Sequence, residues 1–268
     1  MSDVSLPPVG PDSGSTTGTP SGPAPAGSDG PVDRWHRYTT AEPTDASRAS
    51  AVIYGTDIPS ETDLRLLGNL DGKRVLDLGC GIGHNAVQLA RQGAKLIAVD
   101  PNAALLHIAR ERADDAEVKI ELHQSGLADL AFLRSDSVDA ALSVMALAAA
   151  EDLARVFRQV HRVLKPEAAF VMSFPHPAIA MFDPDSAEPT KVLHPYHRND
   201  PMPWTRHGVA VTDHPRTIAE IFTTLHRSSF SVDQLIEPAN TGSRTDATRD
   251  LFSAVPTTLV IRARKQGN

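Results

Sequence analysis

The sequence has little cysteine, a deficit of basic residues and no long apolar run. Its one cysteine, Cys80, excludes an internal disulfide framework and is typical of a reducing compartment, so we expect a cytoplasmic protein. No stretch of about eighteen uncharged apolar residues occurs, which predicts that no helix spans a membrane. With 26 Lys and Arg against 33 Asp and Glu, the net charge of −7 disfavours a nucleic-acid partner, whose phosphates need basic surfaces. Small molecules are therefore the favoured ligands.

Residues 1–31 differ in composition from the rest of the 268-residue chain. They are rich in Pro, Gly and Ser, contain neither Lys nor Arg, and lack an apolar cluster. Such a segment cannot bury enough surface to offset its chain entropy, so we expect a disordered tail. Because it has no basic start and no apolar stretch, it does not resemble a signal peptide. From about residue 32 the composition becomes that of a globular domain.

Apolar strands alternate with amphipathic helices between residues 73 and 174. The predicted strands cover 74–78, 95–99, 118–123, 138–145 and 168–174, and the predicted helices cover 84–92, 102–113 and 152–164. This order is typical of an α/β protein with a doubly wound parallel sheet. Upstream, Ser60 and Asp63 form a capping pattern that starts a helix with an apolar face from Leu64 to Leu70. We therefore expect a helical cap over residues 32–72.

A glycine loop joins the first predicted strand to the following helix. The strand carries Asp77 near its end, and Gly79, Gly81 and Gly83 follow at alternate positions. Glycines accept positive φ and let a ligand approach the backbone, so the loop predicts a small-molecule cofactor. The spacing differs from the G-x-G-x-x-G of dinucleotide sites, and no Gly-Lys-Ser/Thr of a phosphate loop follows. A carboxylate at Asp77 repels a pyrophosphate but suits an ammonium group or ribose hydroxyls.

Asp100 ends the second predicted strand. A carboxylate at this place can accept hydrogen bonds from both hydroxyls of a ribose, as it does in dinucleotide folds. The alternative is a structural role, because Asp100-Pro101-Asn102 also suits the start of the next helix. The two roles are compatible, so we predict ribose binding by Asp100.

The stretch from Val75 to Gly83 resembles motif I of the class I S-adenosylmethionine (SAM) methyltransferases, in the methyltransferase type 11-like superfamily. The turn Val163-Leu164-Lys165-Pro166 resembles the turn before this family's fifth strand, and the likeness extends from Tyr54 to about Glu237. The resemblance implies a Rossmann-like, doubly wound seven-stranded sheet of order 3-2-1-4-5-7-6, with strand 7 antiparallel. It also implies SAM as the cofactor.

The same resemblance divides the chain into parts. The SAM-binding core covers residues 73–174, and residues 216–268 complete the sheet. This last part is expected to supply a helix at 217–227 and strands at 231–236 and 257–264.

The resemblance further implies which residues hold SAM. The expected cofactor-binding residues are Tyr54, Asp77, Gly79, Cys80, Gly81, Gly83, Asp100, Pro101, Gly126, Leu127 and Ser143. The acidic residue with which this family reads adenine falls on Gly126, so the backbone of Gly126 and Leu127 is expected to contact adenine. Asp129 is the nearest carboxylate. We expect Tyr54 to fold over the site and Cys80 to fill space without acting as a nucleophile.

Residues 175–215 interrupt the alternation and are rich in Pro, His and Asp. A long irregular stretch inside a domain is usually functional, so we expect a lid or substrate insertion. His176 follows the fifth strand and is a candidate catalytic base for an acceptor, because histidine titrates near neutrality. The alternative for His176 is a structural hydrogen bond. The other histidines of the stretch fit no zinc spacing, so we expect no metal.

The sequence thus favours a SAM-dependent methyltransferase that acts on an O, N or C nucleophile of a small molecule. Two alternatives stay open. The first is an RNA or protein methyltransferase of the same fold. The second is a SAM-binding protein without turnover, which the replaced acidic residue at Gly126 supports. The sequence specifies neither the acceptor nor the oligomeric state.

Overall fold

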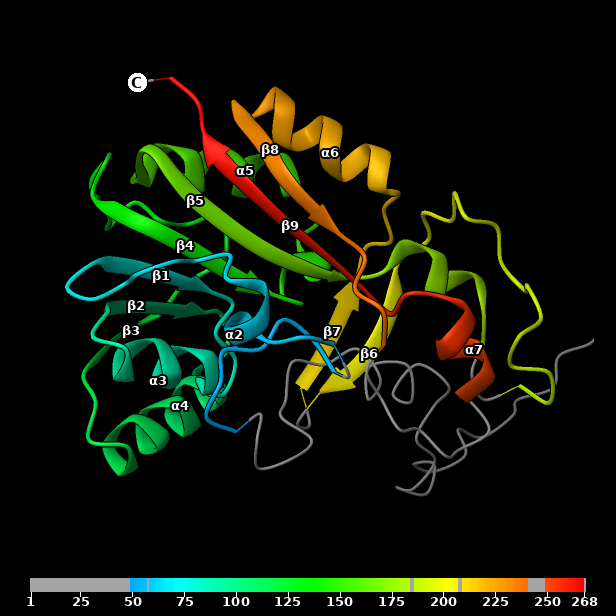
Figure 1. Ribbon diagram of the computed structural model, residues 1–268, viewed down its shortest axis with the longest axis horizontal. Helices are drawn as coiled ribbons and strands as arrows, with labels where there is room; N and C mark the ends of the chain where they lie inside the picture. The colour runs from blue at the N-terminus through cyan, green and yellow to red at the C-terminus, as the bar shows by residue number, and fades with distance from the viewer. Residues whose placement is uncertain (1–48, 57, 184–185, 207–208, 241–248, 268) are drawn as a thin grey trace, which may run out of the picture.

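The computed structural model describes residues 49–268, apart from residues 57, 184–185, 207–208, 241–248 and 268. The predicted tail at 1–31 and the first part of the predicted cap lie outside the described residues. The described chain is built around a central sheet with helices on both faces (Figure 1).

Among the described residues, seven strands form the central sheet, in the order β3-β2-β1-β4-β5-β9-β8. Their bounds are β1 Arg74–Leu78, β2 Lys95–Asp100, β3 Ile120–Gln124, β4 Val138–Val144, β5 Leu164–Pro175, β8 Phe230–Ile236 and β9 Thr258–Lys265. The strands β1 to β5 are parallel, and β9 runs antiparallel to both β5 and β8. With β8 and β9 as strands 6 and 7, this confirms the predicted order. The carboxyl ends of the parallel strands meet at one edge, where ligands bind in open α/β sheets.

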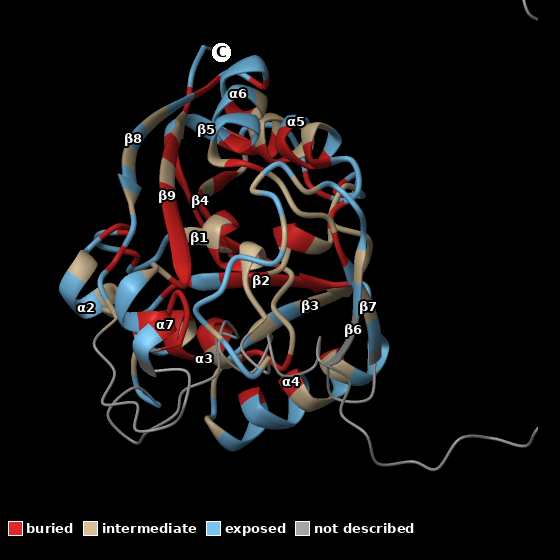
Figure 2. Cartoon of the chain, turned by 90° about the vertical axis from the view of Figure 1, so that its right-hand side faces the viewer, coloured by how far each residue is buried: buried red, intermediate tan, exposed pale blue. Residues whose placement is uncertain are grey.

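The helices lie on opposite faces of the sheet. α3 (His84–Arg91) and α4 (Ala103–Asp115) cover β2 and β3, whereas α5 (Leu153–Val163) and α6 (Ile218–Arg227) pack together on the other face (Figure 1). Because both faces are covered, the inner strands β2, β4 and β5 are buried along most of their length, as their continuous apolar sequences predict (Figure 2). Helix α6 begins with a capping box of Thr217 and Glu220.

The predicted helix of the cap is shorter than expected. α2 spans only Glu61–Leu64, and it ends because Arg65 adopts a left-handed conformation with φ of 52°. The carboxylate of Glu61 accepts the backbone N–H groups of Leu66 and Leu67, both at 2.8 Å, and so turns the chain back after one helical turn. The leucines still reach the core. The remaining described residues of the cap contain no further helix, so its division from the core stays a prediction.

The segment after β5 contains regular structure that the sequence did not predict. A short helix η2 (Pro177–Met181) follows β5, and β6 (Met202–Arg206) and β7 (Val209–Asp213) form a two-stranded ribbon. A further helix, α7 (Arg249–Ala254), precedes β9. The ribbon and α7 lie beyond the end of the sheet at which β4 and β5 finish (Figure 1). The predicted lid therefore lies at the ligand-binding edge.

Candidate functional site

The glycine loop between β1 and α3 is held against the sheet by its backbone. The N–H groups of Gly79 and Cys80 both donate to the carbonyl of Val99 on β2, at 2.7 and 3.1 Å. Gly79, Gly81 and Gly83 all have positive φ, of 78°, 55° and 77°. Other residues adopt this conformation only with strain, which explains why the loop needs glycine.

The three glycines of the loop differ in their surroundings. A Cβ on Gly79 would lie 2.2 Å from the Cβ of Ala146, and one on Gly83 would lie 2.8 Å from the Cβ of Ala109. These two glycines allow close packing of the loop against the segment that follows β4 and against α4. A Cβ on Gly81 would meet nothing within 4 Å. The loop therefore presents open space at Gly81, where a ligand can approach the backbone.

Two carboxylates lie beside the loop, at the ends of β1 and β2. Asp77 is 2% exposed, and its Oδ2 has no hydrogen-bond partner among the described residues. Burial, together with the nearby charge of Asp100, raises the pKa of Asp77 to about 7. A bound cation at Asp77 would relieve both effects. The site therefore fits a ligand with an ammonium group next to the glycine loop.

Asp100 links the glycine loop to the next helix. Its Oδ2 accepts the N–H of Gly81 and its Oδ1 accepts the N–H of Asn102, both at 2.9 Å. Asn102, not Asp100, is the N-cap of α4, because its side chain accepts the N–H groups of Ala104 and Leu105. Asp100 therefore orders the turn before α4 without being its cap, and its predicted contact with a ribose stays a prediction.

The loop after β3 contains the predicted adenine contacts. Leu127 reaches the glycine loop, because its Cδ2 lies 3.6 Å from the position that a Gly79 Cβ would take. A Cβ on Gly126 would lie 2.8 Å from Oδ2 of Asp129. The carboxylate of Asp129 thus occupies the space into which an acidic side chain at residue 126 would extend. Its other oxygen binds Arg155 at 2.8 Å.

Two of the predicted cofactor residues are engaged within the protein. The hydroxyl of Ser143 is fully buried and donates to the carbonyl of Leu78 at 2.7 Å, which joins β4 to β1. Burial and the charges of Asp77 and Asp100 raise the pKa of the Cys80 thiol well above its usual value. A neutral thiol is a poor nucleophile, in agreement with the space-filling role expected for Cys80.

Residues 49–56, called here the strap, run across the start of α3. The side-chain amide of Asn85 makes paired hydrogen bonds with the N–H and carbonyl of Ile53, both at 2.9 Å. His84 and Gln88 bind the carbonyls of Ala51 and Ala49, also at 2.9 Å. Sequence reasoning missed these contacts. The sequence feature that could have indicated these contacts is the presence of two polar residues, Asn85 and Gln88, in α3, where both are buried.

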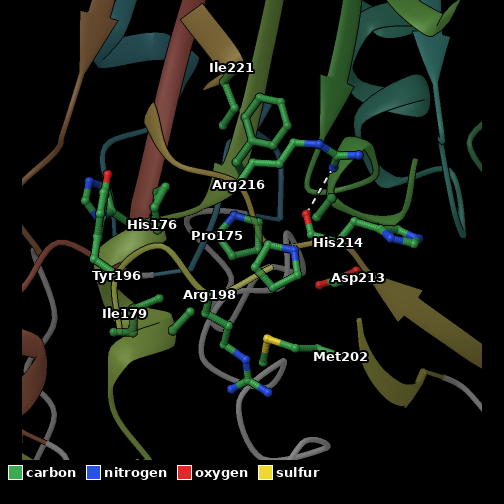
Figure 3. A pocket seen from close by; sticks show the side chains of 15 residues that line it. Pro175, His176, Ile179, Tyr196, Arg198, Met202, Asp213, His214, Arg216 and Ile221 are labelled. Carbon is green, nitrogen blue, oxygen red and sulfur yellow. Dashed lines mark hydrogen bonds between the residues drawn. The ribbon is translucent and has the colours of Figure 1, made fainter. Parts of the chain in front are cut away.

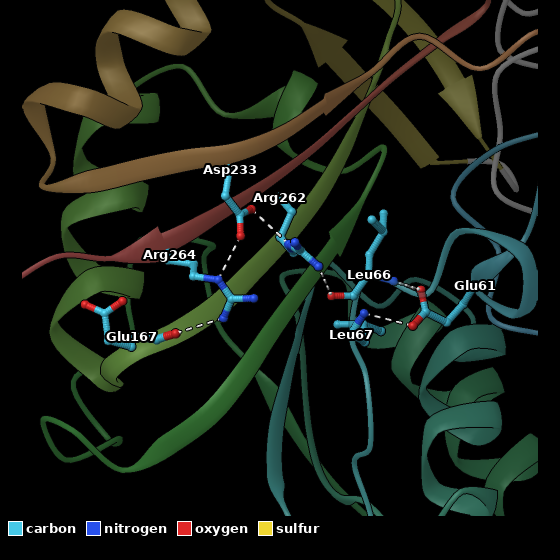
Figure 4. Close-up of polar contacts among 7 residues, drawn as sticks. All are labelled: Glu61, Leu66, Leu67, Glu167, Asp233, Arg262 and Arg264. Atoms are coloured by element: carbon cyan, nitrogen blue, oxygen red, sulfur yellow. Dashed lines mark hydrogen bonds and ion pairs between the residues drawn. The ribbon is translucent and has the colours of Figure 1, made fainter.

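Tyr54 belongs to the strap and is fully buried. Its hydroxyl donates to Glu61 at 2.6 Å, and burial beside this carboxylate raises the pKa of the phenol. Glu61 also holds Leu66, whose carbonyl accepts from Arg262 of β9 (Figure 4). The strap is therefore anchored to both α3 and the sheet. Tyr54 packs into the core, and its predicted position over the cofactor stays a prediction.

His176 caps η2 and is 4% exposed. Its Nδ1 accepts the N–H of Ala178 at 3.1 Å, and its Nε2 lies 2.8 Å from Oε1 of Glu237. These contacts fit a neutral ring that donates from Nε2, and burial lowers the pKa of His176. Both nitrogens are engaged, so a base role requires one contact to open. Glu237 was not among the predicted residues.

A cavity with an empty volume of ≈ 700 Å³, including its open mouth, lies beside the end of β5 (Figure 3). Its walls are mostly apolar and include Phe174, Pro175, Ile179, Met202 and Ile221. The guanidinium of Arg216 is turned toward the carbonyls of residues 150, 151 and 214. The cavity suits the apolar body of a small molecule.

Within the described residues, no group of three or more His, Cys, Asp or Glu side chains could hold a metal.

Comparison with known proteins supports this geometry. Residues 75–167 match a family described as a methyltransferase domain. A SAM-dependent methyltransferase of Mesorhizobium loti, known from its crystal structure, is 30% identical with a TM-score of 0.60. The match covers 76% of this chain and 96% of that one. This chain belongs to the class I SAM-dependent methyltransferases. SAM is the cofactor of the family.

Further relatives agree with this assignment. A putative SAM-dependent methyltransferase of Listeria monocytogenes shares the fold, with 24% identity, a TM-score of 0.64 and coverage of 76% of this chain and 95% of that one. The magnesium-protoporphyrin O-methyltransferase of Rhodobacter capsulatus is 33% identical over 52% of this chain and 66% of its own length. A ubiquinone biosynthesis O-methyltransferase of Alkalilimnicola ehrlichii is 34% identical over 40% and 43%. The match with this chain thus spans less than two thirds of the length of these curated relatives.

No helix among the described residues is long and apolar enough to cross a membrane.

Proposed function

We propose that this protein transfers a methyl group from SAM to an O, N or C nucleophile of a small-molecule acceptor. One observation carries the proposal. The buried oxygen of Asp77 has no hydrogen-bond partner among the described residues, and the charge of Asp100 acts on it. Asp100 in turn accepts the N–H of Gly81, the glycine whose added Cβ would meet nothing within 4 Å. An ammonium group next to a glycine loop is what these two features accommodate, and the amino-acid end of SAM supplies one.

The remaining cofactor contacts follow from this placement. We assign the backbone of Gly79 to Gly83 to the methionine end and the Asp100 carboxylate to the ribose hydroxyls. Gly126 and Leu127 border the adenine. The nearby carboxylate of Asp129 can accept a hydrogen bond from the adenine amino group, because one of its oxygens is directed to the space above Gly126. An oxygen in this space offsets the missing acidic side chain at residue 126.

Catalysis by this chain is chiefly positional. SAM supplies an activated methyl group on its sulfonium, so the protein's residues need to align an acceptor in line with it and exclude water. The cavity beside β5 offers apolar walls for the body of the acceptor. The relatives named magnesium-protoporphyrin O-methyltransferase and ubiquinone biosynthesis O-methyltransferase support an oxygen acceptor among the three kinds.

The alternatives are less well supported. An RNA substrate conflicts with the net charge of −7. A SAM-binding protein without turnover would leave the apolar cavity at the end of β5 without an occupant. A reducing, cytoplasmic location remains our proposal on the single cysteine.

The proposed function is tested by methyl transfer from radiolabelled SAM. The full chain is incubated with labelled SAM and a metabolite extract, and small-molecule products are separated from protein and RNA. We expect label in a low-molecular-weight product. Label found only in RNA or protein, or in no fraction although SAM binds, would contradict the proposal.

A further inference from the structure

Residues 146–151, called here the bridging segment, contact both the cofactor loop and the cavity beside β5. They connect β4 to α5 and contain the short helix η1 (Leu147–Ala149). At the start of the segment, Ala146 packs against the loop, because a Cβ on Gly79 would lie 2.2 Å from the Cβ of Ala146. In its middle, Ala148 lines the cavity. A shift of the bridging segment would therefore move a wall of the cavity relative to the cofactor loop.

The bridging segment satisfies only part of its own backbone. Two of its N–H groups donate to carbonyls within η1 and its cap, both at 3.1 Å. Among the described residues, the carbonyls of Ala148, Ala150 and Glu151 receive no hydrogen bond from the segment itself. Ala148 and Ala150 are buried, and a buried carbonyl without a partner costs free energy. The position of the segment thus depends on donors from elsewhere in the chain.

The connection between β7 and α6 supplies these donors. The backbone N–H of His214 donates to the carbonyl of Ala148 at 2.8 Å. The guanidinium of Arg216 donates to the carbonyl of Ala150 and, at 2.9 Å, to that of Glu151. It also donates to the carbonyl of His214 at 3.0 Å (Figure 3). All three carbonyls of the bridging segment are therefore bound by two residues of this connection.

Arg216 is also part of the cavity wall. Its side chain is half-buried and lines the cavity together with Ala148 and Ile221. A long charged side chain can cover apolar surface with its methylene groups while its charged end makes polar contacts. The same residue therefore borders the proposed acceptor space and binds the segment that reaches the cofactor loop.

We propose that Arg216 is a positioning residue for methyl transfer, because it holds the bridging segment and thereby fixes the acceptor cavity relative to the cofactor loop. This inference rests on the proposed function. Transfer from SAM depends on in-line alignment, and a misplacement of 1 Å can slow such a reaction by about a hundredfold. The loop itself has a separate anchor, since Gly79 and Cys80 donate to Val99 of β2. Arg216 should therefore affect the rate of transfer more than the affinity for the cofactor.

The test compares Arg216 with a matched arginine, Arg162 of α5. Arg162 also binds two backbone carbonyls, those of Leu133 at 2.9 Å and Leu130 at 2.8 Å, but it does not line the cavity. Arg216→Met and Arg162→Met remove the guanidinium and keep an apolar stem. Arg216→Gln removes it with a polar side chain that is too short to reach the carbonyls, and it serves as a second variant should Arg216→Met fail to fold.

Three quantities are measured on the full chain. They are the Tm, the affinity for S-adenosylhomocysteine by calorimetry, and the rate of methyl transfer from saturating labelled SAM into the metabolite extract, at a temperature below every Tm. We expect Arg216→Met and Arg162→Met each to lower the Tm by about 2–8 °C, because both leave carbonyls without partners. Arg216→Met and Arg216→Gln should lose about tenfold in transfer rate and keep the affinity for S-adenosylhomocysteine. Arg162→Met should keep the transfer rate of the wild type.

Two results would overturn the inference. Transfer by the Arg216 variants at the rate of Arg162→Met would show that Arg216 only stabilises the fold. A loss of affinity for S-adenosylhomocysteine as large as the loss of transfer would assign the effect to the cofactor loop instead of the cavity. A wild-type protein that fails to bind S-adenosylhomocysteine or to transfer label would instead contradict the proposed function, which is a distinct outcome.

Discussion

At the scale of single residues, Asp77 and Asp100 show that two buried carboxylates can differ in their hydrogen bonding. Asp100 accepts backbone N–H groups from Gly81 and Asn102, so its charge is stabilised by hydrogen bonds. Asp77 is buried nearby with an unpaired oxygen, and its pKa is raised to about 7. In the protein without ligand, burial of the Asp77 carboxylate therefore costs folding free energy. A cationic ligand bound beside it would offset this cost.

This raised pKa predicts an unusual pH dependence of stability. The folded-state pKa of Asp77 lies above its unfolded value of 3.8, so between these values the folded state binds more protons. Stability from this group is therefore present at low pH and is lost as pH rises toward about 7. Relative to Asp77→Asn, the wild type should lose roughly 2–3 kcal/mol of unfolding free energy between pH 5 and pH 8.

Urea unfolding of both proteins without ligand at the two pH values measures this difference. Asp129→Asn is the matched control, because it makes the same substitution at an exposed side chain. A constant difference between wild type and Asp77→Asn across the range would show that Asp77 titrates as an ordinary carboxylate.

At the scale of elements, the glycine loop separates packing from ligand binding. Gly79→Ala places a Cβ 2.2 Å from Ala146 at a φ of 78°, so we expect a loss of roughly 2–5 kcal/mol in unfolding free energy. Gly81→Ala meets no neighbour within 4 Å and should cost only about 1–2 kcal/mol. Its methyl group would enter the ligand space, so it should weaken S-adenosylhomocysteine at least about tenfold.

Denaturation and calorimetry on the two glycine variants test this separation. Should Gly81→Ala bind S-adenosylhomocysteine as tightly as the wild type, the open face at Gly81 would not be the ligand-binding face.

The strap depends on α3 for its position. Asn85→Ala leaves the buried N–H and carbonyl of Ile53 without their partner, so we expect a loss of roughly 2–4 kcal/mol in unfolding free energy. Asn69→Ala is the matched control, since Asn69 binds Asp71 at the surface and should cost under about 1 kcal/mol. Equal losses in urea unfolding would show that Asn85 does not anchor the strap.

At the scale of the whole molecule, the sheet could be predicted and the contacts around the site could not. Continuous apolar strands and a familiar glycine loop specify the sheet order, because parallel strands must be buried on both faces. The length of the helix after Ser60 was overestimated, because the Glu61 carboxylate accepts the backbone N–H groups of Leu66 and Leu67 and the helix ends before them. The β6–β7 ribbon lies in a stretch rich in Pro and His, whose apolar signal is weak.

Contacts between distant residues account for most of what sequence reasoning missed. His176 and Glu237 are far apart in the chain, and their pairing depends on how the segments after β5 and β8 meet. The approach of Asp129 to Gly126 depends on the shape of a loop, which residue spacing does not specify. Residue types therefore predicted where the cofactor loop lies, while packing decides which neighbours complete the site.

The central claim is that the glycine loop and Asp77 form the SAM site, and calorimetry with S-adenosylhomocysteine at pH 8 tests it most directly. We predict that the wild type binds and that Asp77→Asn loses roughly 1–3 kcal/mol of binding free energy, because a neutral amide no longer balances the ammonium group. No binding heat with the wild type, or equal affinity in the two proteins, would contradict the account.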